Sequence, residues 1–221
     1  MRKRIYTMII GVVFALNGYT QTNLNVVYPL QGDTQPNVIK LTTKHIAMDN
    51  MDLAAVLRFH NIDFIKGEFT GENLQGKYFT LICKNIWNGE ITEVDTIVSA
   101  RIFKNVFGRS PIQRETYTFN MIGGMVGDSL QVDFSPMTSK RYKAIDDKWF
   151  TKWYSLRPTV MRGENIIELN KFTPIFVYML PYQQGNALMW CAVEQSGHDI
   201  EAWGKQFNIE HYMIFEIMFE E

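Results

Sequence analysis

Apolar and polar side chains alternate in two stretches near the middle of the chain, Thr116–Met121 and Leu130–Ser135. Successive side chains of a β-strand point to opposite faces of a sheet, so a period of two predicts strands with one buried face. Between these stretches lie Gly123–Gly124 and Gly127–Asp128, which are typical turn residues. The pattern therefore predicts an antiparallel hairpin.

The dipeptide Asn88–Gly89 separates two longer β-prone runs, Tyr78–Trp87 and Glu90–Val98. Asparagine and glycine both tolerate the positive φ angles that the central positions of a type I′ turn require, and the twist of that turn matches antiparallel strands. We therefore predict a second hairpin here, with Asn88–Gly89 as its turn.

Three later runs are apolar at nearly every position: Ile175–Leu180, Leu188–Val193 and Tyr212–Phe219. Each is shorter than a typical helix, so we interpret each as a strand that is covered on both faces. The earlier run Ile62–Phe69 also reads as a strand, and Gly71 and Gly76 after it indicate a loop.

Two short helices are predicted. Ile200, Trp203 and Phe207 lie on one face of a helix over 199–207, with acidic residues in its first turn. A shorter helical turn follows Asp49, which we expect to be its N-cap.

Around ten short strands with frequent turn residues and one late helix predict a mainly β fold, an antiparallel β-sandwich that is jelly-roll-like, with one short C-terminal helix. We expect residues 21–221 to form a single domain. The alternative, two small β units divided near Pro136–Tyr142, is less favourable because the strands after that point are too apolar to expose one face to water.

The first twenty residues have the three-part order of a secretory signal peptide. Arg2–Arg4 is basic, Met8–Leu16 is apolar, and Gly18 and Thr20 are small. The apolar run is much shorter than the roughly 20 residues of a membrane span. We expect cleavage after Thr20, no permanent transmembrane anchor, and export to the periplasm, the cell surface or the extracellular space; an uncleaved anchor or a buried strand is the alternative.

The run Gly71–Lys77, the strand that follows it, the Asn88–Gly89 turn and the short return strand resemble β-rich families of unknown function with signal peptides, which Gram-negative bacteria export. The resemblance covers about 30 residues. It implies an exported bacterial β domain and transfers no active site.

Composition excludes several classes of protein. Hydrophobic residues make up 46% of the chain and charged residues 20%, so the chain is not disordered, collagen-like or a coiled coil. The formal net charge of -1 gives no basic footprint for nucleic acid. Removing residues 1–20 takes away three basic residues and no acidic one, which leaves a mildly acidic domain.

The two cysteines, Cys83 and Cys191, both lie in apolar, strand-like runs. An oxidising compartment permits a disulfide if their Cα atoms lie within about 7 Å. Two cysteines in a chain of this length do not form the dense pattern that diagnoses a disulfide framework, so we favour buried, unpaired thiols and keep the disulfide as the alternative.

No local motif for catalysis, a metal or a cofactor is present. The four histidines lack metal-ligand spacing, no serine lies in a nucleophile elbow, and no glycine-rich loop continues into a phosphate-binding Lys-Ser/Thr. Paired carboxylates are harder to dismiss, because a glycosidase needs two acids across a cleft and no local signature. The acidic residues near the tryptophan-rich segment are Asp146, Asp147, Glu164 and Glu168.

The segment Trp149–Tyr154 carries the clearest functional suggestion. As a strand it would place Trp149 and Trp153 on one face, where two exposed indoles would form a platform for sugar rings or for a partner's side chains. Tyr154 is the third candidate ligand-binding residue. Burial of the tryptophan face in the sandwich core is the alternative that we favour.

These observations support an exported, non-enzymatic domain that binds a protein or a glycan. A hydrolase of an extracellular polymer that uses paired carboxylates is one alternative. An assembly subunit is the other, because the late strand Tyr212–Phe219 could be added to a partner's sheet if one of its edges is open.

Overall fold

The structure is a computed structural model, and it describes residues 38–46, 50–146, 151–159, 165–190 and 199–221. All of them belong to one compact unit, Gln35–Glu221. The predicted signal peptide over 1–20, Trp149 and Cys191 lie outside the described residues.

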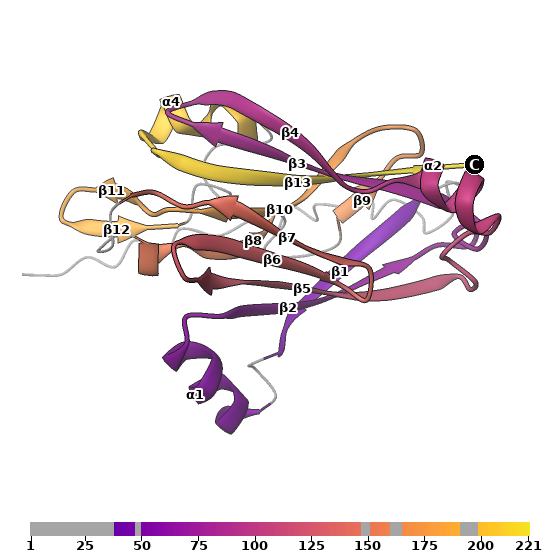
Figure 1. The fold of residues 1–221 in the computed structure, drawn as a ribbon, viewed down its shortest axis with the longest axis horizontal. Coiled ribbons are helices and arrows are strands. Elements are labelled where there is room, and N and C mark those ends of the chain that lie inside the picture. Colours follow the sequence, from indigo (N-terminus) through magenta and orange to yellow (C-terminus); the bar gives the residue numbers. More distant parts are fainter. Residues whose placement is uncertain (1–37, 47–49, 147–150, 160–164, 191–198) are drawn as a thin grey trace, which may run out of the picture. The chain divides into compact units, whose positions relative to one another are not determined.

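The described strands form two antiparallel sheets that pack face to face, which confirms the predicted β-sandwich (Figure 1). Sheet A has the order β7 (Thr138–Lys143), β6 (Ser129–Ser135), β5 (Thr116–Val126), β2 (Asp63–Thr70), β1 (Ile39–His45) and β9 (Asn165–Ile167). Sheet B has the order β4 (Glu90–Val98), β3 (Tyr78–Trp87), β13 (His211–Glu220), β10 (Thr173–Met179) and β8 (Ser155–Pro158).

Short elements complete the described part of the chain. A two-stranded ribbon pairs β11 (Tyr182–Gln184) with β12 (Ala187–Met189). The helical elements are α1 (Met51–Phe59), α2 (Ala100–Ile102), the π-helix η2 (Phe103–Phe107), the 3-10 helices η3 (Thr151–Trp153) and η4 (Ile200–Ala202), and α4 (Trp203–Phe207). Elements η4 and α4 together confirm the predicted late helix, and Ile200 and Trp203 are buried as its pattern requires.

Aromatic side chains from both sheets meet in the core. Phe119 of β5 stacks on Phe69 of β2 and on Phe134 of β6, with ring centroids 4.9 and 4.8 Å apart. Phe119 also meets the edge of Phe176 of β10, and Phe69 meets the edge of Phe219 of β13, so these rings join sheet A to sheet B. The alternation that predicted β5 and β6 thus reflects one face of sheet A packing on sheet B.

The Asn88–Gly89 hairpin is confirmed to the residue. Asn88 has a φ of 50° and Gly89 a φ of 77°, as a type I′ turn requires. The turn also packs on α4, because a Cβ built at Gly204 would lie 2.5 Å from the Gly89 Cα. Glycine is therefore needed at position 89 both for its backbone conformation and for close packing.

We expect Gly89→Val to lower the free energy of unfolding by more than about 1 kcal/mol, because a β-branched residue at positive φ is strained. Its Cβ would also lie 2.6 Å from Lys205 Cγ. Denaturant unfolding of the parent, of Gly89→Val and of Gly76→Val measures this loss of stability. Gly76 is the matched control, because it also has positive φ but no atom lies within 4 Å of its built Cβ. Equal losses would show that close packing of the Gly89 turn on α4 adds nothing.

Two local predictions are wrong. Gly123 and Gly124 belong to β5 rather than to a turn, and the β5–β6 turn is made by Gly127 and Asp128 alone. The N-cap of α1 is Asn50, whose side chain accepts a hydrogen bond from Leu53 N at 3.0 Å; Asp49 lies outside the described residues. The prediction of a covered strand over Tyr212–Phe219 is confirmed: the run belongs to β13, which pairs with β3 on one side and β10 on the other, so neither of its edges is open.

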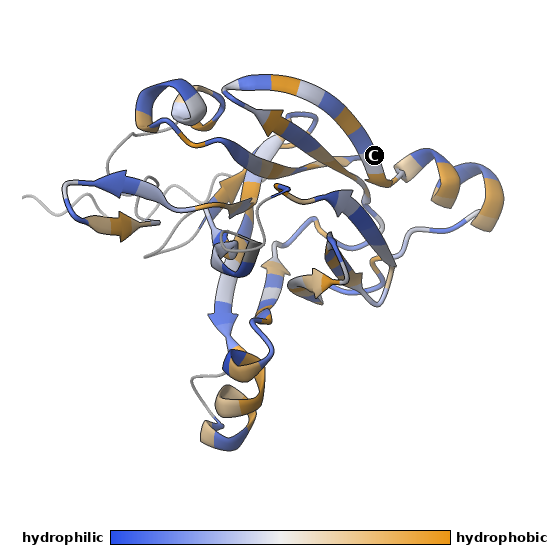
Figure 2. Ribbon diagram, turned by 60° about the vertical axis from the view of Figure 1, so that its left-hand side comes forward, coloured by the Kyte–Doolittle hydropathy of each residue, from blue (hydrophilic) through white to orange (hydrophobic). Residues whose placement is uncertain are grey.

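No helix in the described part of the chain is long and apolar enough to cross a membrane. Figure 2 shows apolar residues on two short helical segments that lie at the periphery of the sheets, α1 and α2 with η2. Phe59 of α1 and Val106 of η2 are 84% and 71% exposed.

Candidate functional site

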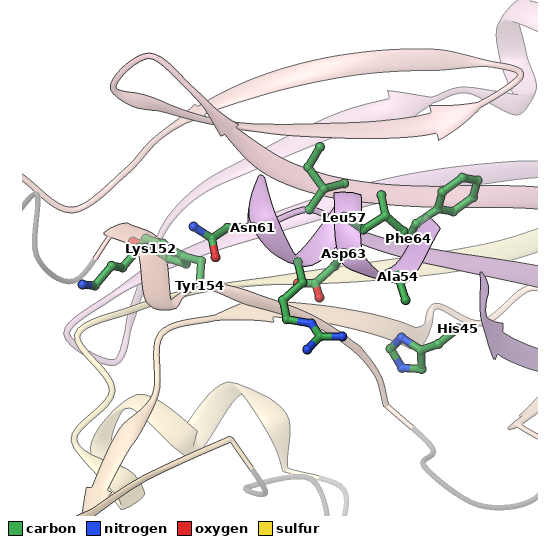
Figure 3. Close-up of a pocket in the computed structure, with 10 residues that line it drawn as sticks. His45, Ala54, Leu57, Asn61, Asp63, Phe64, Lys152 and Tyr154 are labelled. Carbon is green, nitrogen blue, oxygen red and sulfur yellow. The ribbon is translucent and has the colours of Figure 1, made fainter. Parts of the chain in front are cut away.

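A cavity of about 310 Å³ lies where β1, α1 and β2 meet the segment before β8. Figure 3 shows Asn61, Asp63 and His45 along it, with the ammonium group of Lys152 at one end pointing away from the others. The described residues that line it are His45, Ala54, Leu57, Arg58, Asn61, Ile62, Asp63, Phe64, Lys152 and Tyr154.

Asp63 is the acidic group of this cavity. It begins β2 in the same register as the buried residues Ile65 and Phe69, so its side chain faces sheet B rather than solvent. Asp63 Oδ2 accepts a hydrogen bond from Leu156 N of β8 at 2.6 Å. Burial raises the pKa of this carboxyl, although the Leu156 hydrogen bond and the nearby Arg157 charge act in the opposite direction.

His45 ends β1 directly opposite Ile65, which places its side chain on the same face of sheet A as Asp63. Burial lowers the pKa of His45, and the neighbouring Asp63 charge partly offsets that effect. The cavity therefore brings an imidazole and a carboxyl group onto one partly buried surface.

The C-terminal end of α1 positions two further polar residues of the cavity, Arg58 and Asn61. Asn61 has a φ of 51°, Ile62 N donates to Leu57 O at 2.8 Å, and Asn61 N donates to Arg58 O at 3.2 Å. These are the two hydrogen bonds of a Schellman cap, which ends a helix with a residue in the left-handed conformation. The cap fixes the chain direction between Arg58 and Asp63.

Gly123, the β5 residue paired with Asp63, lacks a side chain and so leaves space for the ring of Tyr178. Gly123 pairs with Asp63 across β2 and β5, and a Cβ built there would lie 3.2 Å from the Tyr178 ring. Tyr178 of β10 thus packs against the backbone of sheet A beside the carboxyl group. This close approach explains why an alternating strand carries a glycine where a turn was predicted.

A buried hydrogen-bond network begins at Tyr154, which also lines the cavity. The Tyr154 hydroxyl accepts from Ile145 N at 3.2 Å and contacts His211 Nδ1, and His211 Nε2 lies 2.7 Å from Asn85 Oδ1. Because the Asn85 oxygen only accepts, His211 Nε2 carries the proton and Nδ1 accepts from Tyr154. His211 is completely buried and neutral, and Trp87 stacks on its ring.

The strand geometry on which a platform of Trp149 and Trp153 depended is not found in the described residues of this segment. Trp153 belongs to the 3-10 helix η3, and the indole that it meets is Trp190, whose ring centroid lies 6.2 Å away. Trp190 Nε1 donates to Trp153 O at 3.0 Å. Lys152 Nζ lies over the Trp153 ring and the Arg157 guanidinium lies over the Trp190 ring.

Two buried hydrogen-bond donors lie among these cations and indole rings. Trp153 Nε1 and Arg157 Nε have no hydrogen-bond acceptor among the described residues. Buried polar groups nearly always have a partner. Tyr154, the other predicted binding residue, is buried but reaches the cavity. Trp149 lies outside the described residues.

The remaining predicted site residues are the two cysteines, Cys83 and Cys191. Cys83 is buried on β3, and burial raises the pKa of its thiol to about 12, which makes the thiol unreactive. Its pairing with Cys191 falls outside the described residues. No group of three or more histidine, cysteine or acidic side chains in the described ranges could hold a metal ion.

Sequence reasoning did not select His45, Arg58, Asn61 or Asp63. One signal was present: Asp63 occupies an inward position of the series Asp63, Ile65, Gly67 and Phe69, where a carboxylate is costly to bury. No local sequence pattern indicated that the end of β1 would lie next to residues 152–157.

Comparison with protein-family models, with curated protein sequences and with solved structures finds no match for this chain.

Proposed function

We propose that this protein is an exported, non-enzymatic binding domain whose cavity at His45 and Asp63 takes a polyhydroxylated ligand, such as one residue of a glycan. The observation that carries the proposal is the mixture of hydrogen-bonding groups around one small cavity. Asp63 supplies a carboxyl group, Asn61 a carboxamide, Arg58 a guanidinium group and His45 an imidazole. Export rests on the basic, apolar and small residues in the order found over 1–20.

A sugar hydroxyl both donates and accepts hydrogen bonds, so a cavity lined by both donors and acceptors complements it. Asp63 and Arg58 carry opposite charges, and the ammonium group of Lys152, at one end of the cavity, points away from them, which favours a neutral polar ligand over a strongly charged one. Leu57 and Phe64 supply apolar surface for the carbon–hydrogen faces of a sugar ring. The cavity volume of about 310 Å³ suits a small ligand.

Binding is favoured over the two alternatives. Hydrolysis of a glycosidic bond by paired carboxylates needs two acids, and Asp63 is the only acid among the described residues that line the cavity. Assembly through the strand Tyr212–Phe219 needs an open edge, and β13 is hydrogen-bonded on both sides.

We expect the protein to bind at least one oligosaccharide on a glycan array, and Asp63→Asn to weaken that binding about tenfold. Hydrogen bonds to a charged carboxylate contribute about 1–2 kcal/mol more than those to a neutral amide. Arg58→Gln should weaken binding to the same glycan, because Arg58 is exposed and lines the cavity.

Asp133→Asn is the matched control for this measurement, since Asp133 lies on the outer face of β6, away from the cavity. Equal binding by Asp63→Asn and the parent would contradict the proposed cavity. Release of reducing sugar from a soluble polysaccharide by the parent would instead assign a hydrolase.

A further inference from the structure

The helical segment Ala100–Phe107 presents apolar side chains to solvent. It consists of α2 followed by η2, and it lies beside the C-terminal end of β13 (Figure 1). Ile102 is 51% exposed, Val106 71% and Phe107 60%. Figure 2 shows this segment projecting beyond the strands with apolar residues on its outer turn. Such side chains cost free energy in water, so a grouped set of them indicates an interaction surface.

The segment is held firmly by the sandwich. Phe103 packs on the core residue Phe79, with ring centroids 6.2 Å apart, and Phe107 packs on Phe103 at 5.7 Å. Lys104 Nζ bonds to Glu220 Oε2 at 3.1 Å and also to the backbone oxygen of Glu221. These contacts fix the orientation of the helix, so Val106 and the outer part of Phe107 are presented to solvent by a rigid support.

Basic residues lie close to the apolar side chains in the sequence, and Arg109 lines one groove together with Phe107. The sequence from Thr96 to Arg114 contains four basic residues and no acidic one. Lys104 is neutralised by Glu220, but Arg101, Arg109 and Arg114 are exposed and have no ion pair within the described ranges. The exposed charges at Arg101 and Arg109 are therefore positive, although Glu115 follows in the sequence, Glu220 and Glu221 lie beside Lys104, and the whole chain has a formal net charge of -1.

A groove next to the helix extends the apolar surface. Its volume is about 410 Å³, and Phe103, Phe107, Pro111 and Met137 line it together with Arg109. Apolar side chains at a projecting helical turn, with arginines beside them, are the combination that binds at the boundary between headgroups and acyl chains of a bilayer. A protein partner would instead need a complementary hollow for the projecting turn.

We propose that the surface formed by Arg101, Ile102, Val106, Phe107 and Arg109 docks this protein onto a bilayer of anionic phospholipid. Val106 and Phe107 enter the headgroup and acyl boundary, while Arg101 and Arg109 contact lipid phosphates. This docking surface is separate from the cavity at His45 and Asp63, and it does not depend on the function proposed for that cavity.

The test is co-sedimentation with vesicles of phosphatidylcholine mixed with phosphatidylglycerol, compared with vesicles of phosphatidylcholine alone. We expect the parent to bind the anionic vesicles more strongly, with an affinity that falls as salt is added. Each of Arg101→Gln and Arg109→Gln should weaken binding about fivefold, because one basic residue near an anionic surface contributes about 1 kcal/mol. Combined Val106→Ser and Phe107→Ser should weaken it at least about tenfold.

The matched control is Val56→Ser combined with Phe59→Ser on α1, where the apolar side chains are 55% and 84% exposed. Its vesicle binding should equal that of the parent. All variants keep the same N-terminal residues, so the differences between them report on this surface alone. The arginine variants change only exposed side chains and remain informative if the apolar variant is unstable.

Two results would overturn the proposal. One is equal binding of the parent to both kinds of vesicle. The other is anionic-vesicle binding that the arginine and apolar variants leave unchanged. Loss of self-association in Val106→Ser combined with Phe107→Ser, measured by analytical ultracentrifugation without vesicles and accompanied by no vesicle binding of the parent, would assign the surface to a second copy of the chain.

Discussion

Phe119→Ala is expected to lower the free energy of unfolding by about 3–5 kcal/mol, measured by denaturant unfolding at neutral pH. The Phe119 ring is almost completely buried and contacts rings from both sheets. Removing it takes away buried apolar area and leaves a cavity that the rigid strands around it cannot close.

Gly67 provides the internal control for this prediction. A Cβ built at Gly67 of β2 would lie closer than 3.0 Å to three carbons of the Phe119 ring. Gly67→Ala alone should therefore cost about 1–3 kcal/mol through overpacking. In the Phe119→Ala background the same methyl group enters the vacated space, so its cost should fall markedly. Additive losses in the double variant would contradict the proposed contact.

The second large effect concerns pH. Burial lowers the pKa of His211 to about 3 from the ordinary value of 6.5. The unfolded chain therefore binds a proton at a higher pH than the folded chain does. We expect the free energy of unfolding to be highest above about pH 6.5 and to fall by up to about 1.4 kcal/mol per pH unit as the pH decreases toward about 3.

Denaturant unfolding across this pH range, with His211→Gln beside the parent, isolates the contribution of His211. The variant has no imidazole to protonate at position 211, so its free energy of unfolding should decrease less steeply with acid, whatever its value at neutral pH. Asp63, whose pKa is shifted upward, is present in both proteins and cancels in the comparison. His60→Gln, at an exposed histidine, is the matched control. Identical slopes for the parent and His211→Gln would contradict the prediction.

Much of the fold could be predicted because its signals are local. Period-two alternation identified β5 and β6, and the positive φ angles demanded at Asn88–Gly89 identified the hairpin. The strand considered for 149–154 does not form over Thr151–Trp153, and the reason is tertiary. Trp153 O accepts a hydrogen bond from Trp190, 37 positions later, and this contact accompanies a 3-10 turn instead of a strand.

The candidate site could not be predicted in the same way. His45 and Asp63 come together through the register of β1 with β2, and Leu156 reaches Asp63 from 93 positions away. Gly123 looked like a turn residue because its reason for being glycine, the close approach of Tyr178, lies on another sheet. Periodicity reports which face of a strand is buried, but not which polar groups of distant strands meet at its end.

The position of β13 in sheet B has a consequence for how the molecule is made. The strand that joins β3 to β10 is the last of the described strands, and β3 comes more than a hundred residues earlier. Until residues 211–220 are synthesised, the β3–β4 hairpin and the β8–β10 pair have no partner between them, and each has an unsatisfied edge. Sheet B is therefore completed only when β13 inserts between β3 and β10. Pairing between segments this far apart in the sequence is slow to form, so sheet B is expected to be a late part of folding.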